Sequence, residues 1–341
     1  MAPGHARARG GASDGDIISR HTPWPRLACY RAGVRVAVIG AGGVGGFLGS
    51  LLAQAGHEVQ FLARGEHLAA IRERGLDLRS RQFGDFTVRA SATDSPADLH
   101  PADLVLVAVK MYDLASVLDA VQRALADGGR ALTIQNGLDA PYDVARLVGP
   151  ERVLIGTATI EATVLSPGVV GHLVPLHELT LSELQGPPTP RLTALTDELR
   201  GARINVSIEP DGYHALWRKA APLIPFATVT TAASCGIGSL TDVPEAHALF
   251  GELLHEAIAV ARACGDDARD SIQRYQDMVP SVARQAPSFT SSMNRDLLAG
   301  KRLELDWLTG KLLDLADQHS VAVPSHRALH AVIKLRLANR S

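Results

Sequence analysis

A glycine-rich turn between a strand-like run and an amphipathic helix constrains the fold more than any other feature of this sequence. Residues 40–45 read G-A-G-G-V-G, directly after the β-branched run at residues 35–39. Apolar residues then recur at helical spacing over 43–55, and residues 58–62 form a second strand-like run. A G-x-G-x-x-G in this strand–helix–strand context is typical of dinucleotide-binding units. The sequence therefore predicts an α/β domain with a cofactor site at its first turn.

Each position of this turn has a separate predicted role. Gly40 permits the tight turn, Gly42 lets the backbone approach a pyrophosphate, and Gly45 lets the helix pack closely on the strand. The free N–H groups at the start of the helix, where Gly43 and Val44 lie, favour negative charge. We expect these five residues to contact the cofactor; the alternative is a glycine-rich turn without a ligand.

The end of the second strand indicates which dinucleotide binds. NAD sites usually place Asp or Glu there, whereas this chain has Ala63, Arg64, Gly65, Glu66 and His67. A guanidinium suits a phosphate group, so Arg64 predicts contact with a 2′-phosphate and favours NADPH over NADH. Glu66 is expected to cap the next helix. The alternative for Arg64 is an exposed arginine without a ligand.

Strands and helices continue to alternate, which predicts parallel βαβ units with right-handed crossovers. A helix is expected at residues 66–74, a hairpin within 76–91, a helix at 113–126, and strands at 103–109, 130–135 and 152–156. Residues 164–184 and 203–208 alternate like strands at a sheet edge. Helical periodicity then dominates, over 212–235, 244–265, 269–279, 290–299, 302–320 and 325–338. We predict a nucleotide-binding domain at 34–208 and a helical domain at 209–341, with the site between them.

Several classes of protein are disfavoured by composition. Residues 1–33 are rich in Gly, Pro, Ala and Arg and lack an apolar core, so we expect a disordered extension or a misassigned start rather than a signal peptide. The net charge of −2 argues against a nucleic-acid surface. No apolar run approaches the ~18 residues that cross a membrane. Three distant cysteines favour a reducing cytoplasm, and no histidine spacing predicts a metal site.

Polar residues end two of the predicted strands. Lys110 follows the apolar run VLVAV, and Asn136 follows TIQ at the end of the next strand. The carboxyl ends of such strands face the ligand crevice, so both side chains are candidates for contact with cofactor and substrate. Lys219 and Glu304 in the helical half are less informative by themselves. Lys219 could be a solvated helix charge, and Glu304 could pair with Lys301 on a helix surface.

Six segments of the chain together resemble the ketopantoate reductase (2-dehydropantoate 2-reductase) family. They are GAGGVGGFLGSLLAQAGHEVQFLARG, VAVKMYD, TIQNGLDA, LWRKA, SSMNRDLLAGKRLELDWLTG and HSVAVPSHRAL, within a resemblance that extends from Val34 to Leu335. The resemblance implies an α/β N-terminal Rossmann-type doubly wound parallel sheet plus an all-α C-terminal domain. It also implies NADPH-dependent reduction of a 2-oxo acid, 2-dehydropantoate to pantoate in pantothenate biosynthesis, by a cytoplasmic enzyme that could be a homodimer.

The resemblance also assigns roles to residues. Lys219 is similar in position to the catalytic lysine and Glu304 to the catalytic carboxylate of the family. Ser292 corresponds to the serine that contacts the substrate carboxylate, and Lys110 and Asn136 to residues lining the cofactor and substrate cleft. A lysine ammonium can stabilise the charge that develops on a ketone oxygen and donate the proton. Partial desolvation would lower its pKa and improve this match.

The sequence departs from the family pattern where asparagines are expected. Those positions hold Leu223, Ala227, Phe289 and Thr309. Pro222 and Pro225 should also kink or break the helix that carries Lys219. Three alternatives therefore stay open. The substrate is a more apolar ketone or 2-oxo acid of specialised metabolism, the alignment shifts near the prolines, or the chain is a non-catalytic NADP(H)-binding regulatory protein.

Overall fold

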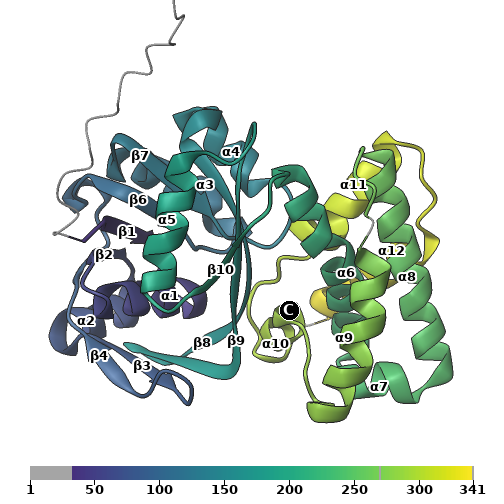
Figure 1. The fold of residues 1–341 in the computed structure, drawn as a ribbon. Coiled ribbons are helices and arrows are strands. Elements are labelled where there is room, and N and C mark those ends of the chain that lie inside the picture. The colour runs from purple at the N-terminus through teal and green to yellow at the C-terminus, as the bar shows by residue number, and fades with distance from the viewer. Residues whose placement is uncertain (1–32, 269, 340–341) are drawn as a thin grey trace, which may run out of the picture. The chain divides into compact units, whose positions relative to one another are not determined.

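The computed structural model describes residues 33–268 and 270–339, and Figure 1 shows their arrangement. The extension expected at residues 1–33 lies outside the described residues, apart from Gly33. Strands and helices alternate in the first part of the chain, and helices alone follow Ile208. Among the described residues, no helix combines the length and the apolarity that a membrane crossing requires.

The glycine turn lies in the strand–helix–strand unit that the sequence predicted. β1 (Arg35–Ile39), α1 (Gly43–Gln54), β2 (Glu58–Leu62) and α2 (Gly65–Arg74) follow one another with short connections. The antiparallel hairpin β3 (Leu76–Ser80) and β4 (Phe86–Val88) comes next. The remaining elements are β5 (Ser91–Thr93), η1 (Pro96–Asp98), β6 (Ala102–Val107), α3 (Met111–Ala124), β7 (Leu125–Thr133), α4 (Ala140–Val148), η2 (Pro150–Arg152), β8 (Val153–Ser166), β9 (Val169–Glu183), α5 (Pro190–Gly201) and β10 (Asn205–Ile208).

These strands form one sheet in the order β4-β3-β9-β8-β7-β6-β1-β2-β5, with β10 also paired to β9. The strands from β5 to β8 along this order are parallel, whereas β8 and β9 are antiparallel. The expectation that residues 164–184 lie at an edge is wrong, because β9 has β8 on one side and β3 and β10 on the other. The alternating polarity of β9 reflects the unequal exposure of the two faces of the sheet. Of the two segments expected at an edge, 164–184 and 203–208, only the second contains an edge strand, β10.

The two faces of the sheet build separate apolar cores, which is what a doubly wound sheet requires. Val36 and Val38 of β1 pack in the cluster that contains Phe47 of α1. Ala37 and Ile39 pack in the cluster that contains α3 and α4. Because side chains alternate along a strand, β1 is buried on both faces. The chain leaves β1 for β2 and later crosses to β6 on its other side, so a ligand crevice is expected outside the carboxyl end of β1.

The helical half surrounds one long buried helix. Its elements are α6 (Gly212–Ala233), α7 (Ile237–Asp242), α8 (Pro244–Ala263), α9 (Ser271–Gln285), α10 (Ser292–Leu298), the π-helical turn η3 (Asp306–Gly310), α11 (Lys311–Gln318) and α12 (Pro324–Ala338). In Figure 1 they are coloured green to yellow, and α6 packs against α8, α10 and α12. The helix expected at 302–320 begins only at Asp306, with a π-helical turn.

The sequence predicted a helix over 212–235 that Pro222 and Pro225 would kink or break; the break is wrong, because α6 runs without interruption over both residues. Proline costs a helix one backbone hydrogen bond and a steric clash. Tertiary packing supplies most of the stability of a helix in a protein. Pro225 is buried within α6, among contacts to four neighbouring helices, and this burial outweighs the local penalty.

Candidate active site

The glycine turn packs α1 tightly against the carboxyl end of β1. Gly40 has a φ of +104°, a left-handed conformation that glycine adopts without strain. A Cβ on Gly45 would collide with the carbonyl oxygen of Gly40 and lie 2.8 Å from the Cβ of Ala108. These contacts give Gly40 and Gly45 the structural roles that the sequence predicted.

Gly42 lies on the open side of the same turn. No atom is within 4 Å of the position that its Cβ would occupy. It is the N-cap of α1, which has no side-chain cap and no acidic residue in its first turn. No described residue accepts a hydrogen bond from its N–H. Free N–H groups beside open space fit the pyrophosphate of a dinucleotide, because the helix dipole favours an anion there.

Gly43 lies against a strand that the sequence did not place there. A Cβ at this position would collide with the carbonyl oxygen of Ala162 and lie 2.8 Å from the Cα of Thr163, both in β8. β8 therefore passes directly against the first turn of α1. The absence of a side chain at Gly43 is required by this strand.

A partly buried ion-pair cluster joins the end of β6 to the helical half, with Glu304 as its most buried member. Lys110 is the N-cap of α3, and its Nζ lies 2.8 Å from Glu304 Oε2 and 2.9 Å from Asp296 Oδ2. The N–H of Met111 donates to Glu304 Oε1 at 3.0 Å. Burial lowers the pKa of Lys110, but the charges of Glu304 and Asp296 outweigh it and raise the pKa above its usual value. Lys110 therefore stays charged and binds Oε2 of Glu304, while the N–H of Met111 binds Oε1.

Lys219 lies on α6 and faces the long strand β8. Its Nζ donates to the carbonyl oxygen of Ala158 at 2.7 Å. Burial lowers the pKa of Lys219 to about 8, while the charge of Glu304 acts in the opposite direction. Among the described residues no ion pair joins Lys219 to Glu304, whose carboxylate is held by Lys110. The two residues share one electrostatic environment without direct contact.

Ser292 lies in the first turn of α10, which Ser291 caps by accepting from the N–H of Asn294. Residues four apart lie on the same face of a helix. Ser292 and Asp296 therefore share a face, and Asp296 contacts Lys110. This relation places the serine on the side of α10 that carries Asp296, a partner of Lys110. The role of Asp296 was missed from the sequence, although its spacing from Ser292 is a detectable signal.

A second missed pair connects β8 with α10. Arg295 donates to the carbonyl oxygen of Thr290 at 2.9 Å and lies 3.0 Å from Glu161 Oε2. Burial raises the pKa of Glu161, and Arg295 opposes this effect. No sequence pattern joins residue 161 to residue 295, because their proximity depends on the path of β8.

Asn136 follows β7 and is half-buried beside the end of β6. The amide of Gln135 donates to the carbonyl oxygens of Val107 and Val109 at 3.0 and 3.1 Å, which ties the two strand ends together. The next residue, Gly137, has a φ of +105°, and its Cβ would lie 3.1 Å from the carbonyl oxygen of Trp307. The loop that carries Asn136 therefore lies against η3.

Arg64 follows β2 and is exposed at the same edge of the sheet. Its Nη2 lies 2.9 Å from Oδ2 of Asp113, in the first turn of α3. The side chain remains 72% exposed, so it is accessible to a phosphate. Glu66 lies in the first turn of α2 but forms no side-chain cap, contrary to the expected capping bond. Asp113 was not singled out from the sequence.

The positions expected to hold asparagines make mainly internal contacts. Ala227 is fully buried in the helical core. The ring of Phe289 stacks on Phe226, with centroids 5.9 Å apart. The hydroxyls of Thr309 and Thr228 are 2.7 Å apart, so two helical segments share a buried hydrogen bond. Leu223 is half-buried on α6.

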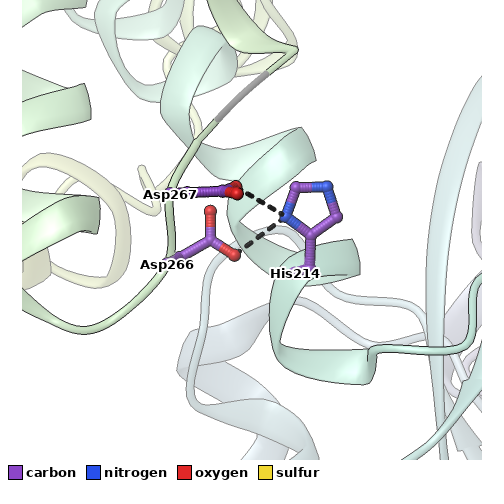
Figure 2. A group of neighbouring side chains, drawn as sticks. All are labelled: His214, Asp266 and Asp267. Atoms are coloured by element: carbon purple, nitrogen blue, oxygen red, sulfur yellow. Dashed lines mark hydrogen bonds and ion pairs between the residues drawn. The ribbon is translucent and has the colours of Figure 1, made fainter.

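His214 anchors the first turn of α6, the helix that carries Lys219. Figure 2 shows its Nδ1 directed toward Asp266 and Asp267, at 2.9 and 3.9 Å. The other oxygen of Asp266 accepts from the N–H of Ala268 at 2.7 Å. The ligand-type atoms of these three side chains lie within 4.8 Å of one another. Because Asp266 already binds both His214 and a backbone N–H, the group fixes the α8–α9 loop against α6.

Comparison with known proteins decides the family. The family model "Ketopantoate reductase PanE/ApbA" matches residues 36–186, and its C-terminal counterpart matches residues 211–337. The chain belongs to the ketopantoate reductase family. It is accordingly an oxidoreductase that acts on a CH–OH group, in a family whose substrate is a small 2-oxo acid.

Individual relatives match along almost their full length. The 2-dehydropantoate 2-reductase of Halobacterium salinarum is 31% identical over 303 residues, which cover 89% of this chain and 98% of the relative. A PanE/ApbA family ketopantoate reductase structure from Ralstonia eutropha is 32% identical, with a TM-score of 0.79 over 90% of this chain and 99% of that one. A D-mandelate dehydrogenase solved with NADH and anilino(oxo)acetate shares the fold, with a TM-score of 0.81, 20% identity, and 89% and 99% coverage.

Two glycine substitutions should separate cofactor binding from stability. Gly42→Ala places a methyl in open space at a φ of −70° that alanine accepts, so it should leave stability unchanged and weaken dinucleotide binding. Gly45→Ala forces a methyl into the backbone of Gly40 and should cost about 1–3 kcal/mol of stability. Urea unfolding and dinucleotide titration measure the two effects. Equal loss of stability in both variants would contradict this assignment.

Proposed function

We propose that the chain reduces a 2-oxo acid to the 2-hydroxy acid with NADPH in the cytoplasm, and that the substrate is 2-dehydropantoate, which becomes pantoate in pantothenate biosynthesis. The observation that carries the proposal is Lys219, an ammonium with a pKa lowered to about 8 beside the buried carboxylate of Glu304. A general acid works best when its pKa lies near the working pH. Family membership supports the reaction class, and the exposed Arg64 supports the choice of NADPH.

The glycine turn would hold the pyrophosphate at Gly42 and the start of α1, and Arg64 would bind the 2′-phosphate. The bound dinucleotide supplies the hydride that the carbonyl carbon receives. Lys219 stabilises the negative charge that develops on the carbonyl oxygen and gives that oxygen a proton. Its Nζ is oriented by the carbonyl oxygen of Ala158. The hydroxyl of Ser292 would donate to the substrate carboxylate.

Glu304 and Lys110 set the electrostatic environment of Lys219. Glu304 opposes the desolvation of Lys219, so the ammonium keeps its proton at neutral pH. Lys110 binds the carboxylate of Glu304 and holds it where its charge acts on Lys219. Asn136, next to the end of β6, would contact the cofactor or the substrate. A carboxylate substrate is favoured by the ammonium of Lys219, which forms no ion pair with a carboxylate of the described residues.

A second candidate function is reduction of a more apolar 2-oxo acid. The observation that favours it is Leu223, which is half-buried on the helix of Lys219 where an asparagine was expected, because a substrate hydroxyl left unpaired in a buried site costs about 1–3 kcal/mol. A third candidate, a dinucleotide-binding regulatory protein without turnover, is disfavoured by the presence of both Lys219 and Glu304.

A substrate panel should distinguish these functions. The purified protein is supplied with NADPH and with 2-dehydropantoate, an unbranched apolar 2-oxo acid or an aryl 2-oxo acid, and oxidation of the nicotinamide is followed by its absorbance. We expect the highest kcat/KM with 2-dehydropantoate. Preference for an apolar acid would favour the second candidate, and binding of NADPH without turnover of any acid would favour the third.

The pH dependence should identify Lys219 as the acid. Lys219 is protonated below about pH 8 and neutral above it, so the rate of reduction should fall as the pH rises through this value. Lys219→Ala should abolish reduction and leave dinucleotide binding intact. Lys334→Ala removes an exposed lysine paired with Asp306 and serves as the matched control. Unchanged turnover in Lys219→Ala would remove this residue from the mechanism.

Replacing Arg64 should reveal the choice of dinucleotide. Arg64→Ala removes the exposed guanidinium, and we expect about a tenfold or greater loss of NADPH affinity with little change for NADH. Arg79→Ala is the control, since Arg79 is also exposed and paired with carboxylates but lies in the β3–β4 hairpin. Equal losses for both dinucleotides, measured by titration calorimetry, would contradict a 2′-phosphate contact.

A further inference from the structure

His67 connects the glycine turn to a distant part of the chain. It is the third residue of α2, and its Nε2 lies 2.8 Å from the carbonyl oxygen of Ala41. Its Nδ1 accepts from the N–H of Gly168 at 3.0 Å, in the turn between β8 and β9. The ring thus joins two loops that are separated by more than a hundred residues of sequence.

These two contacts determine the tautomer of the ring. A backbone N–H can only donate, so Nδ1 of His67 must carry a lone pair toward Gly168. The carbonyl oxygen of Ala41 can only accept, so the proton lies on Nε2. His67 is therefore neutral and directional, as a donor to the glycine turn and an acceptor from the β8–β9 turn.

The β8–β9 turn is itself held in place. The carbonyl oxygen of Gly168 accepts from the N–H of Asp77 at 2.9 Å, at the start of β3. A guanidinium nitrogen of Arg74 donates to the carbonyl oxygen of Pro167 at 2.5 Å. Nδ1 of His67 therefore accepts from a turn that hydrogen bonds to β3 and α2 hold in place, so the position of the ring is fixed.

Nε2 of His67 donates to the carbonyl oxygen of the peptide group between Ala41 and Gly42. In a trans peptide the C=O and the N–H point in opposite directions. Because the carbonyl of Ala41 points to His67, the N–H of Gly42 points away from α2. This N–H has no acceptor among the described residues, and the space around Gly42 is open.

We propose that His67 is a positioning residue for the dinucleotide: its hydrogen bond to Ala41 orients the Ala41–Gly42 peptide so that the N–H of Gly42 is presented to the pyrophosphate. The proposal rests on the proposed function, because it takes the glycine turn as the cofactor site. His67 contacts neither the substrate nor the reacting atoms, so its effect is on cofactor affinity.

Three variants separate the two bonds of the ring. His67→Ala removes both, His67→Gln keeps a donor near the position of Nε2, and His67→Asn keeps an acceptor near that of Nδ1. His57→Ala is the matched control: His57 also accepts from a backbone N–H, that of Val34 at 3.1 Å, but it precedes β2, at the opposite end of the strands from the glycine turn. Melting temperatures establish that each variant is folded.

We expect His67→Ala to raise the Kd and the KM for NADPH about tenfold, the effect of one lost hydrogen bond, with kcat at saturating cofactor within about twofold of the wild type. His67→Gln should recover most of the affinity for NADPH. His67→Asn should bind NADPH as weakly as His67→Ala does. His57→Ala should bind it as tightly as the wild type. An unchanged Kd in His67→Ala, or equal recovery by the Asn variant, would overturn the proposal.

Hydrogen exchange of the cofactor-free protein supplies a readout that does not depend on the proposed function. Exchange over residues 40–46 should accelerate in His67→Ala and stay unchanged in His57→Ala and His67→Gln. Unchanged exchange in His67→Ala would overturn the positioning role even if the protein binds NADPH. Faster exchange in a protein that binds no dinucleotide would instead refute the proposed function and the cofactor part of this proposal, while supporting the control of the turn by His67.

Discussion

The ion pair between Lys110 and Glu304 is the interaction on which the site depends. It joins the end of β6 to the segment before η3, and a third charge, Asp296, attaches α10 to the same lysine. Glu304 is buried, so removing Lys110 would leave its charge uncompensated, which is costly. The cluster therefore fixes where Glu304 lies and which face of α10 meets Lys110, and the charge of Glu304 offsets part of the desolvation of Lys219.

The long strand β8 connects these parts. At its start it is an ordinary strand of the parallel sheet, paired with β7. Farther along, it offers a carbonyl oxygen to Lys219, a carboxylate to Arg295 and backbone atoms against Gly43. One strand therefore aligns the helix that carries the lysine with the helix that begins at the glycine turn.

Local signals predicted most of the fold. The run at residues 35–39, the glycines and the helical spacing that follows each act over a few residues, and β1, α1 and β2 lie where these signals place them. Prediction failed where long-range packing decides. The helix through Pro222 and Pro225 is unbroken because its neighbours bury it, and β9 is an interior strand because β3 and β10 pair with it. Neither effect is encoded in a window of adjacent residues.

For the site, the sequence by itself determined the chemistry that is available: a glycine turn suited to a pyrophosphate, an arginine after the second strand, and lysines and a glutamate in motifs that resemble one family. Only the tertiary structure decided which charges meet. Glu304 binds Lys110, 194 positions away in sequence, and not Lys301, its neighbour three residues back. It also brought Asp296 to Lys110 and His67 to the carbonyl oxygen of Ala41, and it lowered the pKa of Lys219. The physical reason is that ion pairing and desolvation depend on distance in space and on burial, which the folded chain alone sets.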